Sequence, residues 1–166
     1  RFDQQLPYDK DGEIAASGQL DTDLLAQLSG LAFYRQAPPR SLANQTVEAL
    51  YWPILNASKT TIPDQLHTFG VHIASVIADA LPDMGGELML TGGGANNRFL
   101  QQSIADAIQP KGYTLAPVSE TLIDYKEALI FAWMALQVAQ GEASTLPAAT
   151  GAQRAVAGGA IHLPPL

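Results

Sequence analysis

The sequence predicts an α/β domain that is helix-rich and has few, short strands. One observation is an amphipathic helical pattern over residues 61–81. Another is the short apolar run Glu87–Thr91, which ends in three glycines directly before a second helical pattern. A strand, a glycine turn and a helix in succession are typical of α/β sheets. The third is composition: 166 residues, 47% of them apolar and 15% charged, suffice for a single domain, 1–166, with a buried core.

Composition also narrows the class of partner. The net charge of −7 argues against nucleic acid, whose phosphates bind clustered Lys and Arg. No apolar run reaches the ~18–20 residues of a membrane span, so we expect no membrane partner. The absence of cysteine excludes disulfides and thiolate metal sites, and it is compatible with a reducing, cytoplasmic location. The chain starts at Arg1 without a methionine or a signal peptide pattern, which suggests part of a longer protein.

Three helices are expected before the glycines. Asp21 is a suitable N-cap for a short helix to about Leu28. Residues 44–57 are expected to be helical in part, with an interruption at Pro53. Over residues 61–81, apolar side chains recur at steps of three and four, and Pro63 fits an early helical position.

Three further elements follow the glycines. A helix is expected from about Asn97 to Ile108, with Asn96 or Asn97 as its N-cap. Tyr113 to Val118 reads as a second short strand. Residues 128–136 are all apolar, which predicts that their helix is the most buried of the chain.

Two stretches could carry chemistry. Glycine lets the backbone approach a ligand, and a helix start favours an anion, so the turn after Thr91 is either a ligand site or only a tight strand-to-helix turn. No Gly-Lys-Ser/Thr follows, which excludes a P-loop. Glu127, at the entrance of the apolar helix, is either a first-turn acid that suits the helix dipole or a carboxylate beside a pocket. The sequence shows no metal cluster and no identifiable catalytic base.

Five segments resemble, in order, the C-terminal half of the anhydro-N-acetylmuramic acid kinase family. They are Asp9–Gly18, Pro38–Ser41, Thr91–Asn97, Ile123–Ala132 and Thr150–Ala152. The resemblance covers nearly the whole chain, and the last three segments are specific as a set.

The resemblance implies part of an actin-like ATPase lobe of the ribonuclease H-like type. It implies a kinase that uses ATP and Mg²⁺ to hydrolyse and phosphorylate 1,6-anhydro-N-acetylmuramic acid, giving N-acetylmuramic acid 6-phosphate during cell-wall recycling. The family's adenosine turn maps to Gly92, Gly93 and Gly94, with Asn97 as a candidate contact. The family's sugar-binding glutamate maps to Glu127.

The family's catalytic aspartate and its phosphate-binding loop lie upstream of the matched segments, so no catalytic residue is assigned within 1–166. We therefore expect an incomplete domain that needs the N-terminal half of the same enzyme and is inactive alone. Exposed strand edges would favour self-association, including a homodimer. Two alternatives stay open: a nucleotide-binding chaperone or regulator of the same superfamily without sugar kinase activity, and an interaction domain whose glycine turn is only structural.

Overall fold

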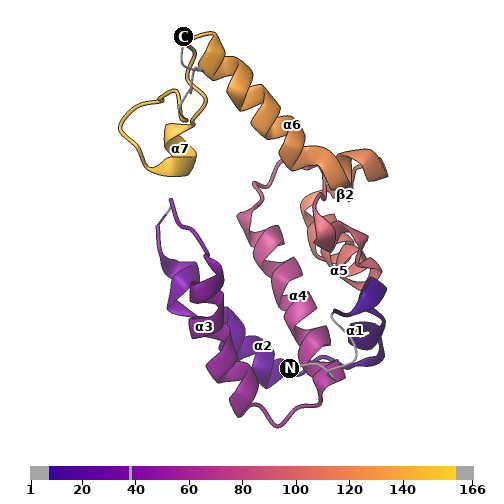
Figure 1. Cartoon of the computed structure of the whole chain (residues 1–166). Helices are drawn as coiled ribbons and strands as arrows, with labels where there is room; N and C mark the ends of the chain where they lie inside the picture. The colour runs from indigo at the N-terminus through magenta and orange to yellow at the C-terminus, as the bar shows by residue number, and fades with distance from the viewer. Residues whose placement is uncertain (1–7, 38, 160–166) are drawn as a thin grey trace.

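The computed structural model describes residues 8–37 and 39–159, and one long helix, α4, lies at its centre (Figure 1). The helices and strands are α1 (Glu13–Ser17), α2 (Thr22–Ser29), α3 (Asn44–Ala57), α4 (Ile62–Ala80), β1 (Gly86–Leu88), α5 (Arg98–Ile108), β2 (Tyr113–Leu115), α6 (Glu120–Ala139) and α7 (Pro147–Thr150). Four short 3₁₀ turns connect them: η1 (Lys10–Gly12), η2 (Ala32–Arg35), η3 (Gly93–Asn96) and η4 (Gln109–Lys111).

The amphipathic helix predicted over 61–81 is confirmed as α4. It begins after Thr61, whose hydroxyl oxygen accepts a hydrogen bond from the Asp64 backbone N–H at 3.3 Å. It ends at Ala80, directly before an extended residue and Pro82, which cannot continue a helix. Its length lets it contact α1 and α5 on one side and α2 on the other.

Two apolar clusters pack against opposite sides of α4. One joins α4 to α5 and β2 and centres on Ala74, Ala78, Ile104, Ile108 and Tyr113. The other joins α2, α3 and α4 around Leu24, Leu28 and Tyr51, with Phe69 packed against it. Burying aliphatic and aromatic side chains contributes roughly 1.5–3 kcal/mol each, so these clusters fix α5 and α2 relative to α4.

The two strands form a small parallel sheet. Gly86 pairs with Tyr113 and Leu88 with Leu115, so each strand is three residues long and shorter than the sequence predicts. A helix-rich α/β fold with few short strands is therefore confirmed. The glycines that follow β1 lead into η3, and η3 contacts α5.

The predicted interruption at Pro53 is wrong, because α3 is continuous from Asn44 to Ala57. A proline inside a helix removes one backbone hydrogen bond and costs about 3 kcal/mol. Tyr51, two residues earlier at 4% exposure, packs into the apolar cluster of α2 and α3 together with Leu50, Ile54 and Leu55. We attribute the continuity of the helix to this packing, which offsets the lost bond.

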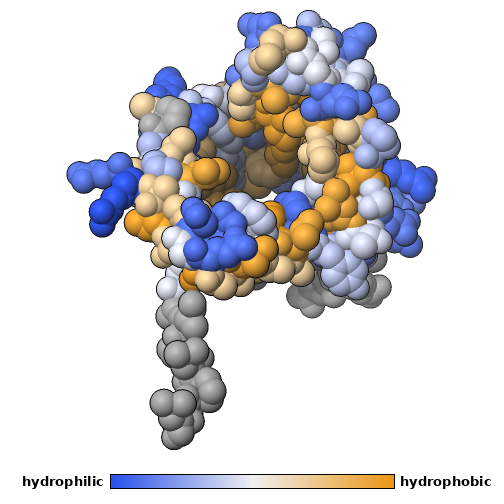
Figure 2. Space-filling view, turned by 90° about the horizontal axis from the view of Figure 1, so that it is seen from above, coloured by the Kyte–Doolittle hydropathy of each residue, from blue (hydrophilic) through white to orange (hydrophobic). Residues whose placement is uncertain are grey.

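The prediction that the helix around residues 128–136 is the most buried of the chain is also wrong. No residue of α6 is buried, and Leu129, Phe131 and Trp133 are 62%, 68% and 52% exposed. The helix begins near β2 and extends away from α4 and α5 (Figure 1). Seen from above, hydrophobic surface surrounds a central hollow (Figure 2). An apolar helix is buried only when neighbouring elements cover it on several sides, and the described residues cover α6 only in part. None of the described helices is long and apolar enough to span a membrane.

Candidate functional site

Two turns that lie about 80 residues apart in the sequence face each other across a cleft of about 580 Å³. We call them the Asp-Lys-Asp-Gly turn (Asp9–Gly12) and the glycine turn (Gly92–Gly94), and the space the inter-turn cleft. It is lined by Tyr8, Asp9, Lys10, Asp11, Gly93, Gly94, Asn96 and Asn97. Small-molecule sites typically occupy about 300–1,000 Å³, so the cleft has the size of a ligand pocket.

The Asp-Lys-Asp-Gly turn is held in place by its first residue. The two carboxylate oxygens of Asp9 accept hydrogen bonds from the backbone N–H groups of Ile14 at 2.9 Å and Ala15 at 3.0 Å. The carboxylate thus satisfies the first donors of α1, as a helix start requires. The last two residues of the turn, Asp11 and Gly12, are both left-handed, with φ of 55° and 75°. The turn is therefore sharply bent and fixed to α1.

Gly12 places this turn directly against Asn97. Gly12 is buried, and a Cβ at its position would lie 2.2 Å from Asn97 Oδ1 and 2.6 Å from Phe99 Cβ. Asn97 Oδ1 also accepts a hydrogen bond from the Leu100 backbone N–H at 2.9 Å, which makes Asn97 the N-cap of α5. The choice between two asparagine caps is thereby decided, and Asn96 is left exposed on the cleft.

The glycine turn leads into α5 through a short 3₁₀ turn rather than directly. Gly92 has φ of 83°, a conformation that other residues rarely adopt. A Cβ at Gly92 or Gly93 would meet nothing within 4 Å, so open space lies over the turn. Two backbone N–H groups, those of Ala95 and Asn97, donate to Gly92 O at 2.9 Å and Gly94 O at 3.1 Å. Because the turn uses these donors itself, it is a poorer anion cradle than a free helix start.

Glu127 is not brought into the inter-turn cleft. Its helix starts at Glu120, where Ser119 Oγ accepts a hydrogen bond from the Leu122 backbone N–H at 3.2 Å. Glu127 therefore lies about two turns inside α6, since a turn takes 3.6 residues. The first-turn dipole interpretation is wrong, and Glu127 is an exposed carboxylate on a regular helix. The same helix contacts η3, which carries Gly93 and Gly94, so α6 lies next to the glycine turn.

Two further polar side chains outside the cleft, those of Arg40 and His72, have structural partners. Arg40 Nη1 donates to Tyr34 O at 2.7 Å and to Gln36 O at 3.2 Å. His72 is 1% exposed and bonds through its two ring nitrogens to Ser29 Oγ at 3.3 Å and Tyr34 OH at 3.0 Å. Its burial lowers its pKa below the ordinary value. Within residues 8–37 and 39–159, no group of three or more His, Cys, Asp and Glu could hold a metal ion.

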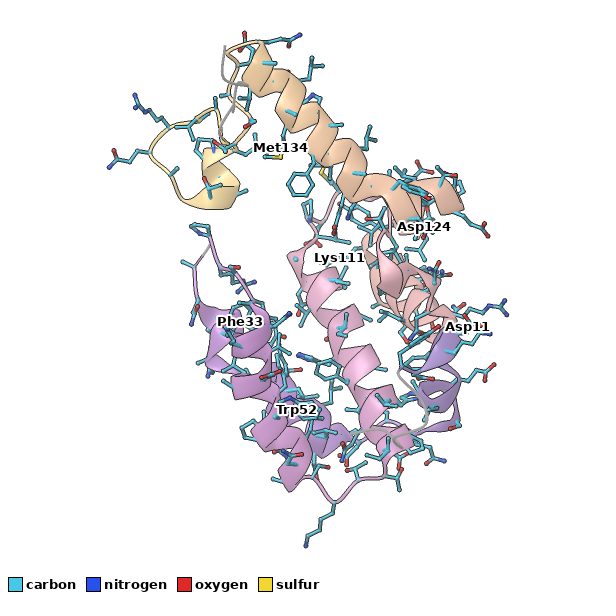
Figure 3. All side chains as sticks on the ribbon, in the orientation of Figure 1. Asp11, Phe33, Trp52, Lys111, Asp124 and Met134 are labelled. Carbon is cyan, nitrogen blue, oxygen red and sulfur yellow. The ribbon has the colours of Figure 1, made fainter. Side chains whose placement is uncertain are left out.

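A second cavity, of about 430 Å³, is largely apolar and lies between α3 and α4. It is lined by Asn44, Val47, Glu48, Tyr51, Trp52, Leu55, Ile62, Gln65, Leu66 and Phe69. Trp52 and Asp11 lie on opposite sides of α4 (Figure 3). This cavity is thus separate from the inter-turn cleft and contains none of the residues that the sequence singled out as a site.

Sequence reasoning missed three polar residues of the cleft: Lys10, Asp11 and Asn96. Among the described residues, Lys10 is the one cation that lines it. The Asp-Lys-Asp-Gly segment belongs to one of the five family-like segments, but nothing in the spacing indicates that it meets the glycine turn. That contact depends on how α1 and α5 pack on α4.

Comparison with known proteins gives a family that fits these motifs. The family model described as anhydro-N-acetylmuramic acid kinase matches residues 1–164. Proteins with that name include one from Shewanella sp. strain W3-18-1 (40% identical) and one from Shewanella amazonensis (37%). A third, from Francisella tularensis subsp. novicida, is 31% identical. The alignments cover 92%, 91% and 93% of this chain but 43%, 42% and 42% of those relatives.

The chain therefore spans less than half the length of the curated relatives it matches. The names of these relatives do not favour the alternative of a chaperone or regulator without kinase activity. A match over almost every residue, with identity up to 40% in these three, is enough to assign the family. The chain belongs to the anhydro-N-acetylmuramic acid kinase family.

Proposed function

We propose that the protein to which this chain belongs is an ATP-dependent sugar kinase. It hydrolyses the anhydro bond of 1,6-anhydro-N-acetylmuramic acid and transfers a phosphoryl group to the opened sugar, giving N-acetylmuramic acid 6-phosphate and ADP. The observation that carries the proposal is the meeting of two family-like segments, Asp9–Gly12 and Thr91–Asn97, at one ligand-sized cleft. The family match over residues 1–164 supports the same reading.

In this proposal the glycine turn receives the adenosine part of ATP. Gly92 and Gly93 leave open space where side chains would otherwise stand, and Gly93 and Gly94 line the cleft, which suits the flat face of a base. Asn97 lines the cleft beside them, with its carboxamide oxygen already used as the cap of α5. Its amide N–H₂ is the group that would donate to the nucleotide. ATP supplies the phosphoryl group, and Mg²⁺ would be bound through the phosphates, as is usual for this ion.

Residues 1–166 would form one incomplete domain of an actin-like ATPase lobe. The N-terminal half of the enzyme would supply the catalytic residues and the phosphate-binding loop. The exposed apolar surface of α6 supports this division, since a large uncovered apolar surface usually marks an interface. We place the reaction in the cytoplasm, where ATP is available, and a homodimer would be a further assembly of the complete enzyme.

The test is an assay of the full-length protein with 1,6-anhydro-N-acetylmuramic acid and ATP. We expect ADP release that depends on the sugar, and a product whose mass exceeds that of the sugar by one water and one phosphoryl group. A protein that binds ATP but shows no sugar-dependent turnover would contradict the kinase proposal and favour the regulator. A protein with no nucleotide-dependent thermal shift would favour a structural role for the glycine turn, since ligand at 100 times Kd stabilises by about 2.7 kcal/mol.

A further inference from the structure

Asp11 has an uncommon conformation at the wall of the inter-turn cleft. Among the described residues it is the one non-glycine residue with a positive φ, 55°. Such conformations are uncommon outside glycine, although Asp tolerates them, and they occur often at ligand sites. The turn that holds Asp11 lines the cleft opposite Gly93 and Gly94. The fold therefore holds Asp11 at the wall of the inter-turn cleft, where it would contact a bound ligand.

The acceptors around the cleft are not equally available. The Asp9 carboxylate is used by the N–H groups of Ile14 and Ala15, and Asn97 Oδ1 is used by that of Leu100. Within residues 8–37 and 39–159, no hydrogen bond or ion pair engages the Asp11 carboxylate. It is thus the charged acceptor on this wall that no other described residue uses. Lys10 and Asn96 supply donors in the same cleft.

A ribose ring presents chemistry that complements this wall. Its 2′- and 3′-hydroxyl groups are two adjacent donors, and an ionised carboxylate has two oxygens that accept hydrogen bonds. A phosphate group, in contrast, would be repelled by the Asp11 carboxylate and would find one lysine. The charge and the donors therefore favour the nucleoside part of a nucleotide here over its phosphate tail.

We propose that Asp11 determines specificity for the sugar of the nucleotide by accepting hydrogen bonds from the ribose hydroxyl groups. This inference rests on the proposed function, because it assumes that ATP enters the inter-turn cleft. The glycine turn then faces the base while Asp11 holds the ribose. The enzyme should accordingly prefer ATP to 2′-deoxyATP.

The experiment uses the full-length protein and measures the affinity for ATP and for 2′-deoxyATP by calorimetry, together with KM for each nucleotide. We expect the unmodified protein to bind ATP about tenfold more tightly, as loss of a hydrogen bond to a charged group predicts. Asp11→Gly removes the carboxylate and tolerates the left-handed backbone. It should weaken ATP binding about tenfold, leave 2′-deoxyATP much less affected, and so remove the preference. Asp11→Asn keeps the size of the side chain and the turn conformation. Its affinity for ATP should lie between those of the unmodified protein and Asp11→Gly.

Glu13→Gln is the matched control, because Glu13 is an exposed acid just after the same turn and does not line the cleft. It should keep the preference for ATP. Equal affinity of the unmodified protein for both nucleotides, or an unchanged preference in Asp11→Gly, would overturn the inference. Absence of sugar phosphorylation would overturn the proposed function instead, and the ratio of the two affinities tests Asp11 separately.

Discussion

Gly12 and Asn97 lie so close together that a single added carbon on Gly12 would stand 2.2 Å from Asn97 Oδ1. The two residues belong to different turns, and their contact sets one wall of the inter-turn cleft against the other. Asn97 at the same time caps α5. The contact thus links α1, α5 and the proposed nucleotide site, and several expected outcomes depend on it.

Gly12→Ala should lower the free energy of unfolding by more than the backbone effect alone. At φ of 75°, an alanine is strained by roughly 1–2 kcal/mol, and the clash with Asn97 and Phe99 adds to it. Gly141→Ala is the matched control, because Gly141 has φ of 76° and open space around the added carbon. Urea unfolding should show the larger loss for Gly12→Ala. Equal losses would mean that the contact with Asn97 relaxes without cost.

Substitutions of Asn97 can separate its cap from its proposed ligand contact. Asn97→Ala removes the oxygen that accepts from Leu100 and should cost about 1 kcal/mol of stability. Asn97→Asp is an equally good cap, so stability should be retained, while the amide donor is lost. In the full-length enzyme we therefore expect Asn97→Asp to raise KM for ATP with little change in the melting temperature. An unchanged KM for ATP in Asn97→Asp would limit Asn97 to its role as a cap.

Glu127→Ala should raise KM for the sugar and leave both the stability and KM for ATP unchanged. Glu127 is exposed and makes no cap contact, so the fold loses little without it. The expected increase is about tenfold, the effect of losing a hydrogen bond to a charged group. Asp124→Ala is the control, because Asp124 is an exposed acid one turn earlier on the same helix. If both variants keep the sugar KM of the unmodified enzyme, the sugar-binding role of Glu127 is excluded.

Elements with strong local signals were predictable from the sequence. The caps Asp21 and Asn97, the early Pro63 and the periodic apolar residues of α4 and α5 predict three helices within one or two residues of their observed ends. These signals depend on neighbours three or four residues away. Pro53 and α6 were misjudged because their outcome depends on packing partners. The neighbours of Pro53 pack into the cluster of α2 and α3, which holds that helix together, whereas the described residues leave every residue of α6 unburied.

The candidate site was predictable in part for the same reason. The glycine turn was recognisable, since a run of three glycines is itself a local signal. Lys10 and Asp11 were not singled out, because their place in the cleft depends on the contact of Gly12 with Asn97. A pair of residues 85 positions apart leaves no trace in helical or strand periodicity. Tertiary packing alone brings the two turns together.

Acidification should weaken the fold through His72. Its folded-state pKa is lowered by burial, so between the folded pKa and the unfolded value of about 6.5 the unfolded chain binds more protons. The stabilisation that neutral His72 contributes is therefore complete above pH ~6.5. It is lost as the pH falls toward the folded-state pKa, and the free energy of unfolding decreases by at most about 1.4 kcal/mol per pH unit. Urea unfolding at pH 7.5 and pH 5.5 measures this loss.

His72→Gln is the comparison for that measurement, because it lacks the buried imidazole but retains His67. It should be less stable at pH 7.5 and depend less on pH between 7.5 and 5.5. Asp21 and Asp64 have lowered pKa values, caused first by the Leu24 backbone hydrogen bond and the Thr61 hydroxyl, respectively. Their contributions are lost only near and below pH ~4, outside this range. Equal pH dependence in both proteins would exclude His72 as the cause.

Phe131 and Trp133 should behave in opposite ways in the 166-residue chain and in the full-length protein. In the chain, both are more than half exposed on α6 and contribute little to packing. Replacing both by glutamine, a good helix former, should leave the free energy of unfolding nearly unchanged and shift the chain toward monomer in sedimentation. Leu24→Ala is the control, because Leu24 is buried and its truncation should cost about 2–5 kcal/mol.

In the full-length protein, if the N-terminal half covers α6, the same two glutamines should be destabilising by several kcal/mol, since they would place polar groups in an apolar interface. Full-length stability that the double substitution does not alter would show that α6 is not covered there.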